Sequence, residues 1–367
     1  MRIALIAGAH PYSGIGKYAF NLFERLYNQR RDIDMLYCDT EGTPEFNHDR
    51  IKVLRQSFRW PFKGKTLLPM YYYFPGKIPR GYDIYHISSA RLSRVTKFRK
   101  PAIITHYDLA TLLFPQMYSF PQRLWTRILL RYYKEADKVI AISEASRDEL
   151  LGLDIVPRGK MAVVRPGYDE KLYKPLCKQE ARQKLRLPQE AKIVLNVGSE
   201  EARKDVPTLI KAVYGLQPEI AELMLIRVGS TTPANDALKR RITVREYQDI
   251  PEFQMPLFYN SADLFVFPSI YEGDLGYPPL EAMACGIPTV VTSAVKTCKD
   301  GCATIPAQDV GALTVTMREI LTSPERHKQL SISALNEAKK FTLSREVDEI
   351  YKVYEEVFNE KRVSGES

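Results

Sequence analysis

The sequence lacks any apolar run that approaches the roughly 18 residues needed for a membrane-spanning helix, so no such span is predicted. Its start, residues 1–14, is expected to form a buried first strand rather than a signal peptide. Cysteine is also scarce: five are scattered along the chain, which favours a reducing compartment. The pair Cys298 and Cys302 has no second ligand pair nearby, so no metal site is predicted. We therefore expect a cytoplasmic protein, peripheral to the inner face of the membrane if it meets a membrane at all.

Acidic residues are nearly absent from residues 51–100, where twelve Lys and Arg accompany a single acid, Asp83. The excess extends over residues 1–175, with 29 basic against 17 acidic residues, whereas residues 176–367 carry 24 against 27. Aromatic side chains interleave with the cations over residues 55–80, which favours contact with phosphate head groups or a pyrophosphate-linked lipid. A solvated basic loop is the open alternative. No pattern of a nucleic-acid-binding module is present, so nucleic acid is not expected as a partner.

The 367 residues exceed the size at which single cores stop growing, so two domains are expected. Short continuous apolar runs alternate with helical patterns, which predicts parallel strands covered on both faces and an α/β fold. The predicted strands are residues 2–8, 33–39, 51–55, 84–88, 102–108, 138–143, 161–165, 192–199, 223–229, 264–269 and 289–293. The predicted helices include residues 16–27, 206–216, 279–285 and an amphipathic C-terminal helix.

Turn residues near 166–175 separate the two sets of elements. We therefore predict an N-terminal domain over residues 1–170, a C-terminal domain over residues 171–344, and a helix over residues 345–367 that packs back towards the first domain.

One loop links a predicted strand to a helix near Pro279 and carries a carboxylate at each end, Glu272 and Glu281. Ligands of open α/β sheets bind at the carboxyl ends of the strands, and the amide groups of a helix start favour phosphate oxygens. Gly273 and Gly276 would let the backbone approach such a ligand closely. Glu281 could accept hydrogen bonds from ribose hydroxyls and Glu272 from a sugar, although two such acids could also merely complement a helix dipole.

The segment "YNSADLFVFPSIYEGDLGYPPLEAMACGIPTVVTS", residues 259–293, closely resembles the donor-site signature of retaining GT-B glycosyltransferases, glycosyltransferase family 4. Further segments in matching order resemble that family over most of the chain: residues 11–22, 103–115, 135–150, 161–175 and 194–212. The resemblance implies two Rossmann-like domains that face each other across a cleft. The first would bind the acceptor and the second the nucleotide sugar.

The resemblance also implies roles for single residues. Glu281 would hold the nucleotide ribose, Lys204 with Arg203 would neutralise the diphosphate, and Glu272 would contact the transferred sugar. His106 would lie near the reacting carbon and could act as a general base. The implied donor-binding residues are Gly14, Gly16, Gly198, Ser199, Asp274, Leu275, Gly276, Tyr277 and Glu281.

The implied reaction moves a hexose, mannose or glucose, from a nucleoside-diphosphate sugar such as GDP-mannose to a hydroxyl of a glycan or lipid-linked acceptor. The implied mechanism is front-face attack with retention, in which the leaving phosphate helps to accept the proton. Fixed cations would stabilise the leaving group, so no metal and no other cofactor are expected.

Two departures from the family pattern stand out. Glu272 and Glu281 are nine positions apart, one more than is usual in the family, and the extra residue leaves Asp274 able to share the role of Glu272. Ser199 stands where the family often has an arginine, so that Arg203 would have to compensate.

Two other functions stay open. Residues 14–19 fit the dinucleotide fingerprint G-x-G-x-x-A, and Asp39 lies twenty residues past Ala19, as in nicotinamide-dependent oxidoreductases. However, residues 9–13 separate the strand from the first glycine, which is too long for the tight turn of that motif. The second alternative is a catalytically inactive sugar-nucleotide-binding protein of the same fold.

Overall fold

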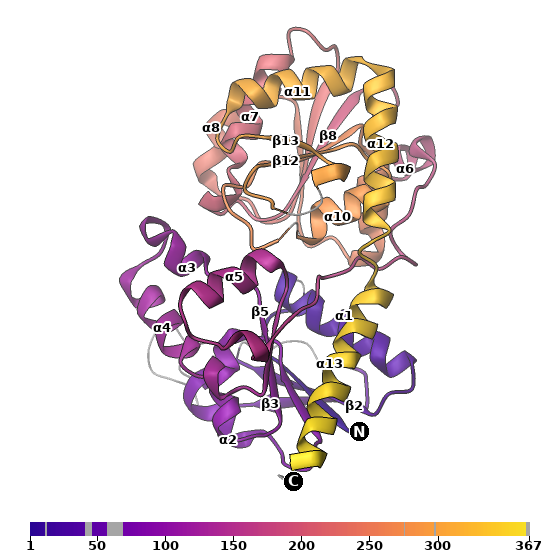
Figure 1. Cartoon of the computed structure of the whole chain (residues 1–367). Coiled ribbons are helices and arrows are strands. Elements are labelled where there is room, and N and C mark those ends of the chain that lie inside the picture. The colour runs from indigo at the N-terminus through magenta and orange to yellow at the C-terminus, as the bar shows by residue number, and fades with distance from the viewer. Residues whose placement is uncertain (12, 41–45, 57–68, 275, 297–298, 365–367) are drawn as a thin grey trace. The chain divides into compact units, whose positions relative to one another are not determined.

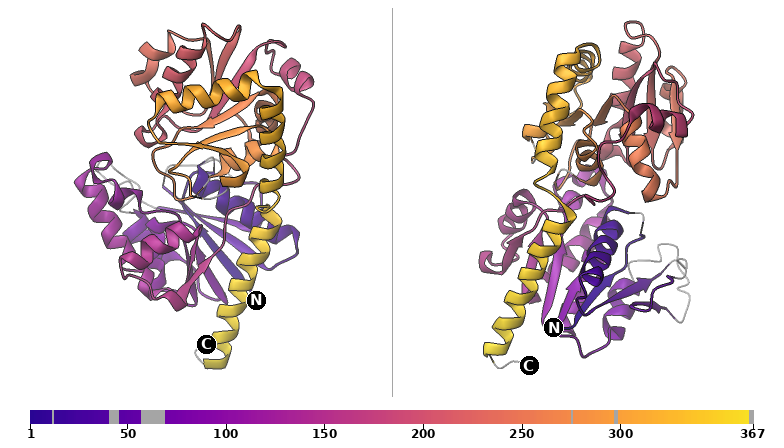
Figure 2. Two further views of the ribbon diagram at one scale, coloured as in Figure 1. Left: turned by 45° about the horizontal axis from the view of Figure 1, so that its top comes forward. Right: turned by 90° about the vertical axis from the view of Figure 1, so that its right-hand side faces the viewer.

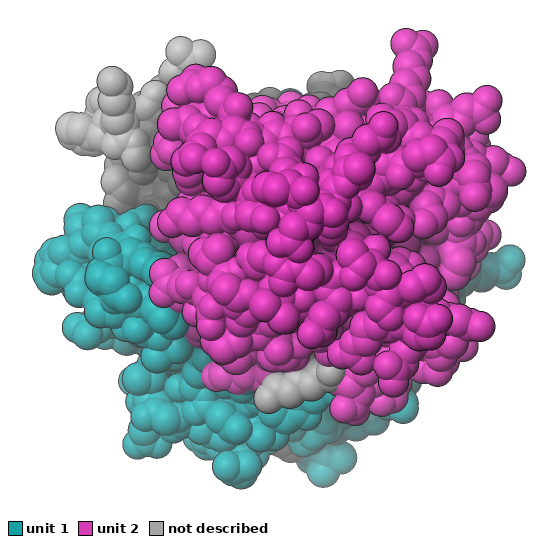
Figure 3. Space-filling view, turned by 90° about the horizontal axis from the view of Figure 1, so that it is seen from above, with its two compact units in different colours: residues 1–166, 343–367 teal, residues 167–342 magenta. Residues whose placement is uncertain are grey.

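The computed structural model divides into two compact units, unit 1 with residues 1–166 and 343–367, and unit 2 with residues 167–342 (Figure 3). The structure describes residues 1–11, 13–40, 46–56, 69–274, 276–296 and 299–364. Much of the basic aromatic segment 55–80 lies outside the described residues, as do Leu275 and Cys298.

Unit 1 is built on a parallel sheet of seven strands in the order β3-β2-β1-β4-β5-β6-β7 (Figure 1). The strands are β1 (Ile3–Ala7), β2 (Ile33–Asp39), β3 (Ile51–Arg55), β4 (Ile84–Ile87), β5 (Ala102–His106), β6 (Lys138–Ala141) and β7 (Met161–Val163). Every residue of β1, β2, β4 and β5 is buried, as the continuous apolar runs predict for strands covered on both faces.

The helices of unit 1 are α1 (Gly14–Asn28), α2 (Phe74–Lys77), α3 (Ala110–Leu113), α4 (Phe120–Leu130), α5 (Glu144–Gly152) and α13 (Leu343–Ser364). Short helices η1 (Pro69–Tyr73), η2 (Ala90–Lys97), η3 (Pro115–Met117) and η4 (Tyr133–Glu135) connect them, with η5 (Arg158–Lys160) before β7. The C-terminal helix α13 buries Val347, Ile350 and Tyr354 in unit 1, as its three–four spacing of apolar residues favours. It lies beside α1, which Figures 1 and 2 show from several sides.

A buried polar network joins α13 to the sheet of unit 1. Nδ1 of His86 lies 2.6 Å from the hydroxyl of Tyr354, and its Nε2 lies 2.7 Å from Oγ1 of Thr105. The hydroxyl of Tyr18 on α1 lies 3.0 Å from the same Thr105 oxygen. Burial lowers the pKa of His86 to about 3, so the imidazole is neutral at pH 7.

Unit 2 contains a parallel sheet of six strands in the order β10-β9-β8-β11-β12-β13. The strands are β8 (Lys192–Val197), β9 (Leu223–Val228), β10 (Val244–Tyr247), β11 (Leu264–Phe267), β12 (Thr289–Thr292) and β13 (Ala303–Ile305). The chain adds β9 and β10 on one side of β8 and then adds β11, β12 and β13 on the other side of β8. The order of the strands therefore reverses between β8 and β11. The sheets of the two units confirm the predicted fold class of two Rossmann-like parallel-sheet domains.

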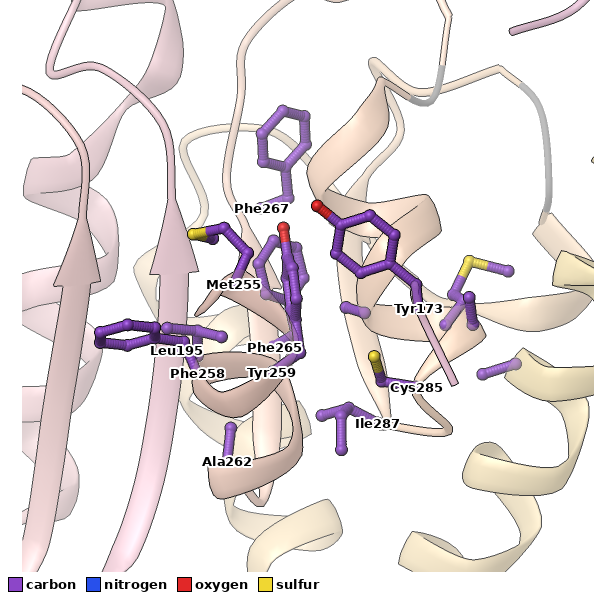
Figure 4. Close-up of a cluster of buried hydrophobic side chains, with 14 of the residues drawn as sticks. Tyr173, Leu195, Met255, Phe258, Tyr259, Ala262, Phe265, Phe267, Cys285 and Ile287 are labelled. Atoms are coloured by element: carbon purple, nitrogen blue, oxygen red, sulfur yellow. The ribbon is translucent and has the colours of Figure 1, made fainter. Parts of the chain in front are cut away.

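Helices cover both faces of the second sheet. They are α6 (Lys178–Lys184), α7 (Val206–Leu216), α8 (Asp236–Lys239), α9 (Met255–Ser261), α10 (Tyr277–Ala284), α11 (Val310–Thr322) and α12 (Pro324–Ala338), with short turns η6 (Ala202–Lys204), η7 (Pro233–Asn235), η8 (Glu252–Gln254) and η9 (Lys299–Gly301). One of the buried apolar clusters is rich in aromatic rings and includes Tyr173, Tyr259, Phe265 and Phe267 (Figure 4). Among the described residues, no helix has the length and apolar character required to cross a bilayer.

Candidate active site

The loops that follow β8 and β11 carry most of the residues predicted to bind the donor. These two strands are neighbours in the sheet, and the order of the strands reverses between them. In open parallel sheets this is the place where loops diverge and leave room for a ligand. Arg203 and Lys204 lie in η6 after β8, and Glu272 lies in the loop after β11.

The structure brings Arg203, Lys204 and Glu272 together. Nζ of Lys204 lies 2.5 Å from Oε1 of Glu272, and Nη1 of Arg203 lies 3.1 and 3.2 Å from the two carboxylate oxygens. A backbone hydrogen bond also joins the loop after β8 to the loop after β11, because the amide of Ile270 donates to the carbonyl of Arg203 at 2.7 Å. Nε of Arg203 further contacts Glu201 at 3.1 Å. We call Arg203, Lys204 and Glu272 the cation cluster.

Lys204 sits in a confined part of this cluster. Its side chain is only 15% exposed, and its ammonium group lies 4.6 Å from the centre of the Phe267 ring. Burial lowers the pKa of Lys204, while the charge of Glu272 acts in the opposite direction. Neither Phe267 nor this confinement was predicted from the sequence, although Phe267 lies in the predicted strand over residues 264–269.

Glu281 lies on α10 and is 3% exposed. The hydroxyl of Tyr259 on α9 donates to its Oε2 at 2.6 Å. Figure 4 shows the hydroxyls of Tyr259 and Tyr173 pointing to the side of the cluster where Phe267 lies. Burial, together with the charge of Glu281, raises the pKa of Tyr259, which keeps this hydroxyl a donor. The sequence analysis missed Tyr259 as the residue that orients Glu281.

The remaining donor-binding residues predicted in unit 2, apart from Leu275, lie at the same edge of the sheet. Gly276 precedes α10 with φ +81°, a conformation that favours glycine, and Tyr277 begins the helix. Asp274 is buried. Gly198 follows β8 directly, and Ser199 comes next.

A buried charged network that the sequence analysis missed lies beneath the loop after β8. The Glu200 carboxylate accepts hydrogen bonds from the amide of Thr232 at 2.9 Å and from Asn235 Nδ2 at 2.9 Å, and Nζ of Lys239 lies 2.7 Å away. Arg227 on β9 is 1% exposed, and its guanidinium contacts Glu200, Asn196 and the Gly198 carbonyl. The network joins the loops after β8 and β9 and so holds the chain that leads to Arg203 and Lys204.

Two glycines pack against each other in these loops. Gly229 has φ +131°, and a Cβ atom there would lie 2.3 Å from the carbonyl oxygen of Gly198. We expect Gly229→Ala to lower the free energy of unfolding by about 1–3 kcal/mol, because both the backbone conformation and the contact forbid a side chain. Chemical denaturation measures the change. The matched control is Gly215→Ala on α7, where the nearest atom would lie 3.8 Å away, and a loss of the same size there would contradict the explanation.

Unit 1 contains the other predicted residues. Gly14 and Gly16 begin α1, whose N-cap is Ser13, and the Oγ of Ser13 accepts from the amide of Gly16 at 3.1 Å. A Cβ atom at Gly16 would lie 1.9 Å from the carbonyl oxygen of His10, whereas one at Gly14 would meet no atom of the described residues within 4 Å. A side chain at position 16 would therefore clash with the His10 carbonyl group.

His106 is the last residue of β5 and is 2% exposed. Its ring packs edge-to-face against Tyr133, with the ring centres 5.6 Å apart. Within the described part of the chain, neither Nε2 of His106 nor the hydroxyl of Tyr133 has a hydrogen-bond partner. Burial lowers the pKa of His106 to about 3, which makes it a weak base at neutral pH and a neutral hydrogen-bonding group.

The two buried histidines predict an acid sensitivity. His86 and His106 both have a pKa of about 3 in the folded chain, against about 6.5 when unfolded. As the pH falls through 6.5, the unfolded chain binds protons that the folded chain does not, so stability is lost. At pH 5 the expected loss relative to pH 8 is about 2 kcal/mol for each histidine.

Denaturant unfolding at pH 8 and pH 5 tests this expectation. His86→Gln should reduce the loss on acidification by about 2 kcal/mol, because one of the two groups is removed. His10→Gln, which changes an exposed histidine, is the control and should leave the loss unchanged. An equal loss in the wild type and His86→Gln would contradict the assignment.

Two family models match the chain, one to each half. Residues 12–172 match the model described as Glycosyltransferase Family 4, and residues 178–337 match Glycosyl transferases group 1. Together the matched ranges cover most of the chain. The chain belongs to glycosyltransferase family 4.

Individual relatives of this glycosyltransferase family 4 chain share less than a third of its residues over the aligned part. The chain is 28% identical over 244 residues to the D-inositol 3-phosphate glycosyltransferase of Thermobispora bispora, and the alignment covers 60% of this chain and 56% of that protein. The chain therefore spans about half the length of the curated relatives that it matches first.

Solved structures share the fold over nearly the whole chain. Sucrose-phosphate synthase (tll1590) from Thermosynechococcus elongatus has a TM-score of 0.81 at 21% identity, covering 98% of this chain and 100% of that one. Anabaena Alr3699/HepE, solved in complex with UDP and glucose, has a TM-score of 0.76 at 17% identity, covering 96% and 99%.

Proposed function

We propose that this glycosyltransferase family 4 chain transfers a hexose from a nucleoside-diphosphate sugar to a hydroxyl of a glycan or lipid-linked acceptor, with retention. The observation that carries the proposal is the cation cluster at the edge where β8 and β11 meet. It lies in the same loop system as the amino end of α10. The family assignment supports this function and argues against the nicotinamide-dependent alternative.

The charges of the cluster suit a diphosphate. Arg203 and Lys204 together carry two positive charges, and Glu272 supplies one negative charge. A bound diphosphate would compete with Glu272 for the two cations, and the amide groups at the start of α10 would add hydrogen bonds to its oxygens. When the bond between sugar and phosphate breaks, negative charge builds on the diphosphate, so these fixed cations favour the transition state.

If the diphosphate displaces Glu272 from Arg203 and Lys204, the carboxylate of Glu272 would become available close to the bond between sugar and phosphate. Glu272, with Asp274 and the backbone of residues 275–277, would then contact the hydroxyls of the transferred hexose. Glu281 would accept hydrogen bonds from the ribose hydroxyls, in the orientation that Tyr259 imposes. Anabaena Alr3699/HepE was solved in complex with UDP and glucose, and the nucleotide and sugar assays below decide which base and which hexose this chain uses.

His106 would serve as a neutral hydrogen-bonding group for the sugar or acceptor. Its buried Nε2 needs a partner, and its lowered pKa makes proton abstraction at neutral pH inefficient. The leaving phosphate would then accept the proton of the attacking hydroxyl as the bond between sugar and phosphate breaks. Gly14 and Gly16 stay predicted donor-binding residues of unit 1, and we propose that this unit binds the acceptor.

Two measurements test the proposal. The midpoint temperature of thermal unfolding should rise when one of GDP, UDP or ADP is added, because ligands that bind the folded state raise its stability. Incubation with GDP-mannose or UDP-glucose and an acceptor extract should release the nucleoside diphosphate. Binding without release would indicate the inactive sugar-nucleotide-binding alternative. Failure of all three nucleotides, or saturable binding of a reduced nicotinamide, would overturn the proposal.

A further inference from the structure

Exposed apolar side chains are concentrated in one part of unit 1. Thirteen large hydrophobic side chains are exposed among the described residues, and five of them come from η1, α3, α4 and the residue that directly follows η2. These elements pack against one another. The five side chains are Tyr72, Phe98, Leu113, Phe120 and Leu124. Phe120 is 68% exposed.

Helix α4 presents two apolar and two basic side chains to solvent along one stripe. Phe120, Leu124, Arg127 and Arg131 follow each other at steps of four, three and four residues, the spacing of one helical face, and all four are exposed. The opposite side of the helix buries residues 129–130. Figure 1 shows α4 beside α3 at the edge of unit 1.

The charge of this region has a single sign. Residues 109–134 contain four cations, Arg123, Arg127, Arg131 and Lys134, and no Asp or Glu. A surface with an excess of cations and with exposed apolar side chains complements an anionic lipid surface.

A small pocket adjoins the end of α4. Its volume is about 280 Å³, and it is lined by the cations Lys97, Arg131 and Lys134 together with Tyr71 and Tyr132, with one carboxylate, Glu135. The hydroxyls of the two tyrosines lie 2.8 Å apart. The pocket therefore combines three cations with amphipathic rings, the side chains that favour the head-group region of a bilayer.

We propose that this surface, which we call the α4 surface (Leu113, Phe120, Leu124, Arg127, Arg131 and Lys134), docks the protein on an anionic lipid bilayer. Phe120 and Leu124 enter the interface between head groups and acyl chains, and the cations of α4 and of the pocket bind lipid phosphates. The inference is separate from the basic segment 55–80 and does not depend on the proposed catalytic activity.

Vesicle sedimentation tests the docking. The wild-type chain should bind vesicles of equimolar phosphatidylcholine and phosphatidylglycerol, and it should bind them less as salt increases. Phosphatidylcholine vesicles should bind much less. The double variant Phe120→Ser, Leu124→Ser should bind at least about tenfold more weakly. Its apolar control is Phe253→Ser in unit 2, where the side chain is 71% exposed.

A second variant removes the charges. Changing Arg127, Arg131 and Lys134 to Gln should weaken binding about fivefold for each cation removed. The control changes three exposed cations of unit 2 to Gln, namely Arg326 and Lys328 on α12 and Lys339 directly after it. Wild-type binding in either α4 variant would overturn the proposal, as would equal binding of both kinds of vesicle.

Tryptophan fluorescence gives a readout that needs no change on α4. Trp125 lies on α4 with its ring 5.3 Å from that of Tyr71, and the chain has one other tryptophan, Trp60. In the variant Trp60→Phe, anionic vesicles with brominated acyl chains should quench Trp125. If the fluorescence of Trp125 is the same with and without these vesicles, the proposal is overturned, even if nucleotide binding by unit 2 remains intact.

Discussion

Lys204→Ala should lower the rate of sugar transfer about 100-fold, with the fold retained. The reason is that Lys204 supplies a confined positive charge where the diphosphate leaves, and removing one such preorganised group commonly has an effect of this size. Initial rates of nucleoside diphosphate release at saturating donor measure kcat directly.

The control for this prediction is Lys211→Ala, an exposed lysine on α7, the helix that follows η6. It should retain the wild-type rate. Lys204→Ala also leaves Glu272 paired with Arg203, so the loop should keep its shape, which circular dichroism and thermal unfolding would report. A rate within a factor of two of the wild type would contradict the role assigned to the cation cluster.

Glu281→Gln should weaken binding of the nucleoside diphosphate about 10-fold or more. Glutamine keeps the size of the side chain and can still accept the hydrogen bond from Tyr259, but it loses the charge that strengthens bonds from ribose hydroxyls. Isothermal titration with the nucleotide that gives the largest thermal shift measures the effect.

A ribose-specific readout sharpens this test. If Glu281 binds the ribose, a 2′,3′-dideoxy nucleotide should bind the wild type and Glu281→Gln with nearly equal affinity, because the hydroxyls in question are missing. Glu319→Gln on α11, outside the loop system of the site, is the control and should bind normally. Equal loss with both nucleotides would mean that Glu281 acts only on the structure of α10.

The fold was largely predictable because strands buried on both faces leave a continuous apolar pattern. β1 and β2 illustrate this, since each of their residues is buried. β10 and β13 were not predicted, because neither leaves a long continuous apolar run in the sequence. β10 (Val244–Tyr247) is an edge strand with exposed and half-buried residues, and β13 (Ala303–Ile305) is only three residues long.

The start of α10 was predicted two residues late. The helix begins at Tyr277, and its two prolines occupy the first turn, where a missing amide hydrogen costs nothing. Proline marked the region of the helix start but not its position, because several residues of a first helical turn tolerate it.

Local order along the chain was enough to predict the alternation of strands and helices, the family, and the candidate residues Lys204, Arg203, Glu272 and Glu281. It was not enough to predict which side chains lie in contact, which depends on the folded arrangement. The folded arrangement pairs Glu272 with two cations some seventy residues earlier, orients Glu281 through Tyr259, and buries Arg227 against Glu200 beneath the loop. The physical reason is that such pairs form between neighbouring strands and loops of the sheet, and local periodicity carries no information about which side chains end up opposite each other.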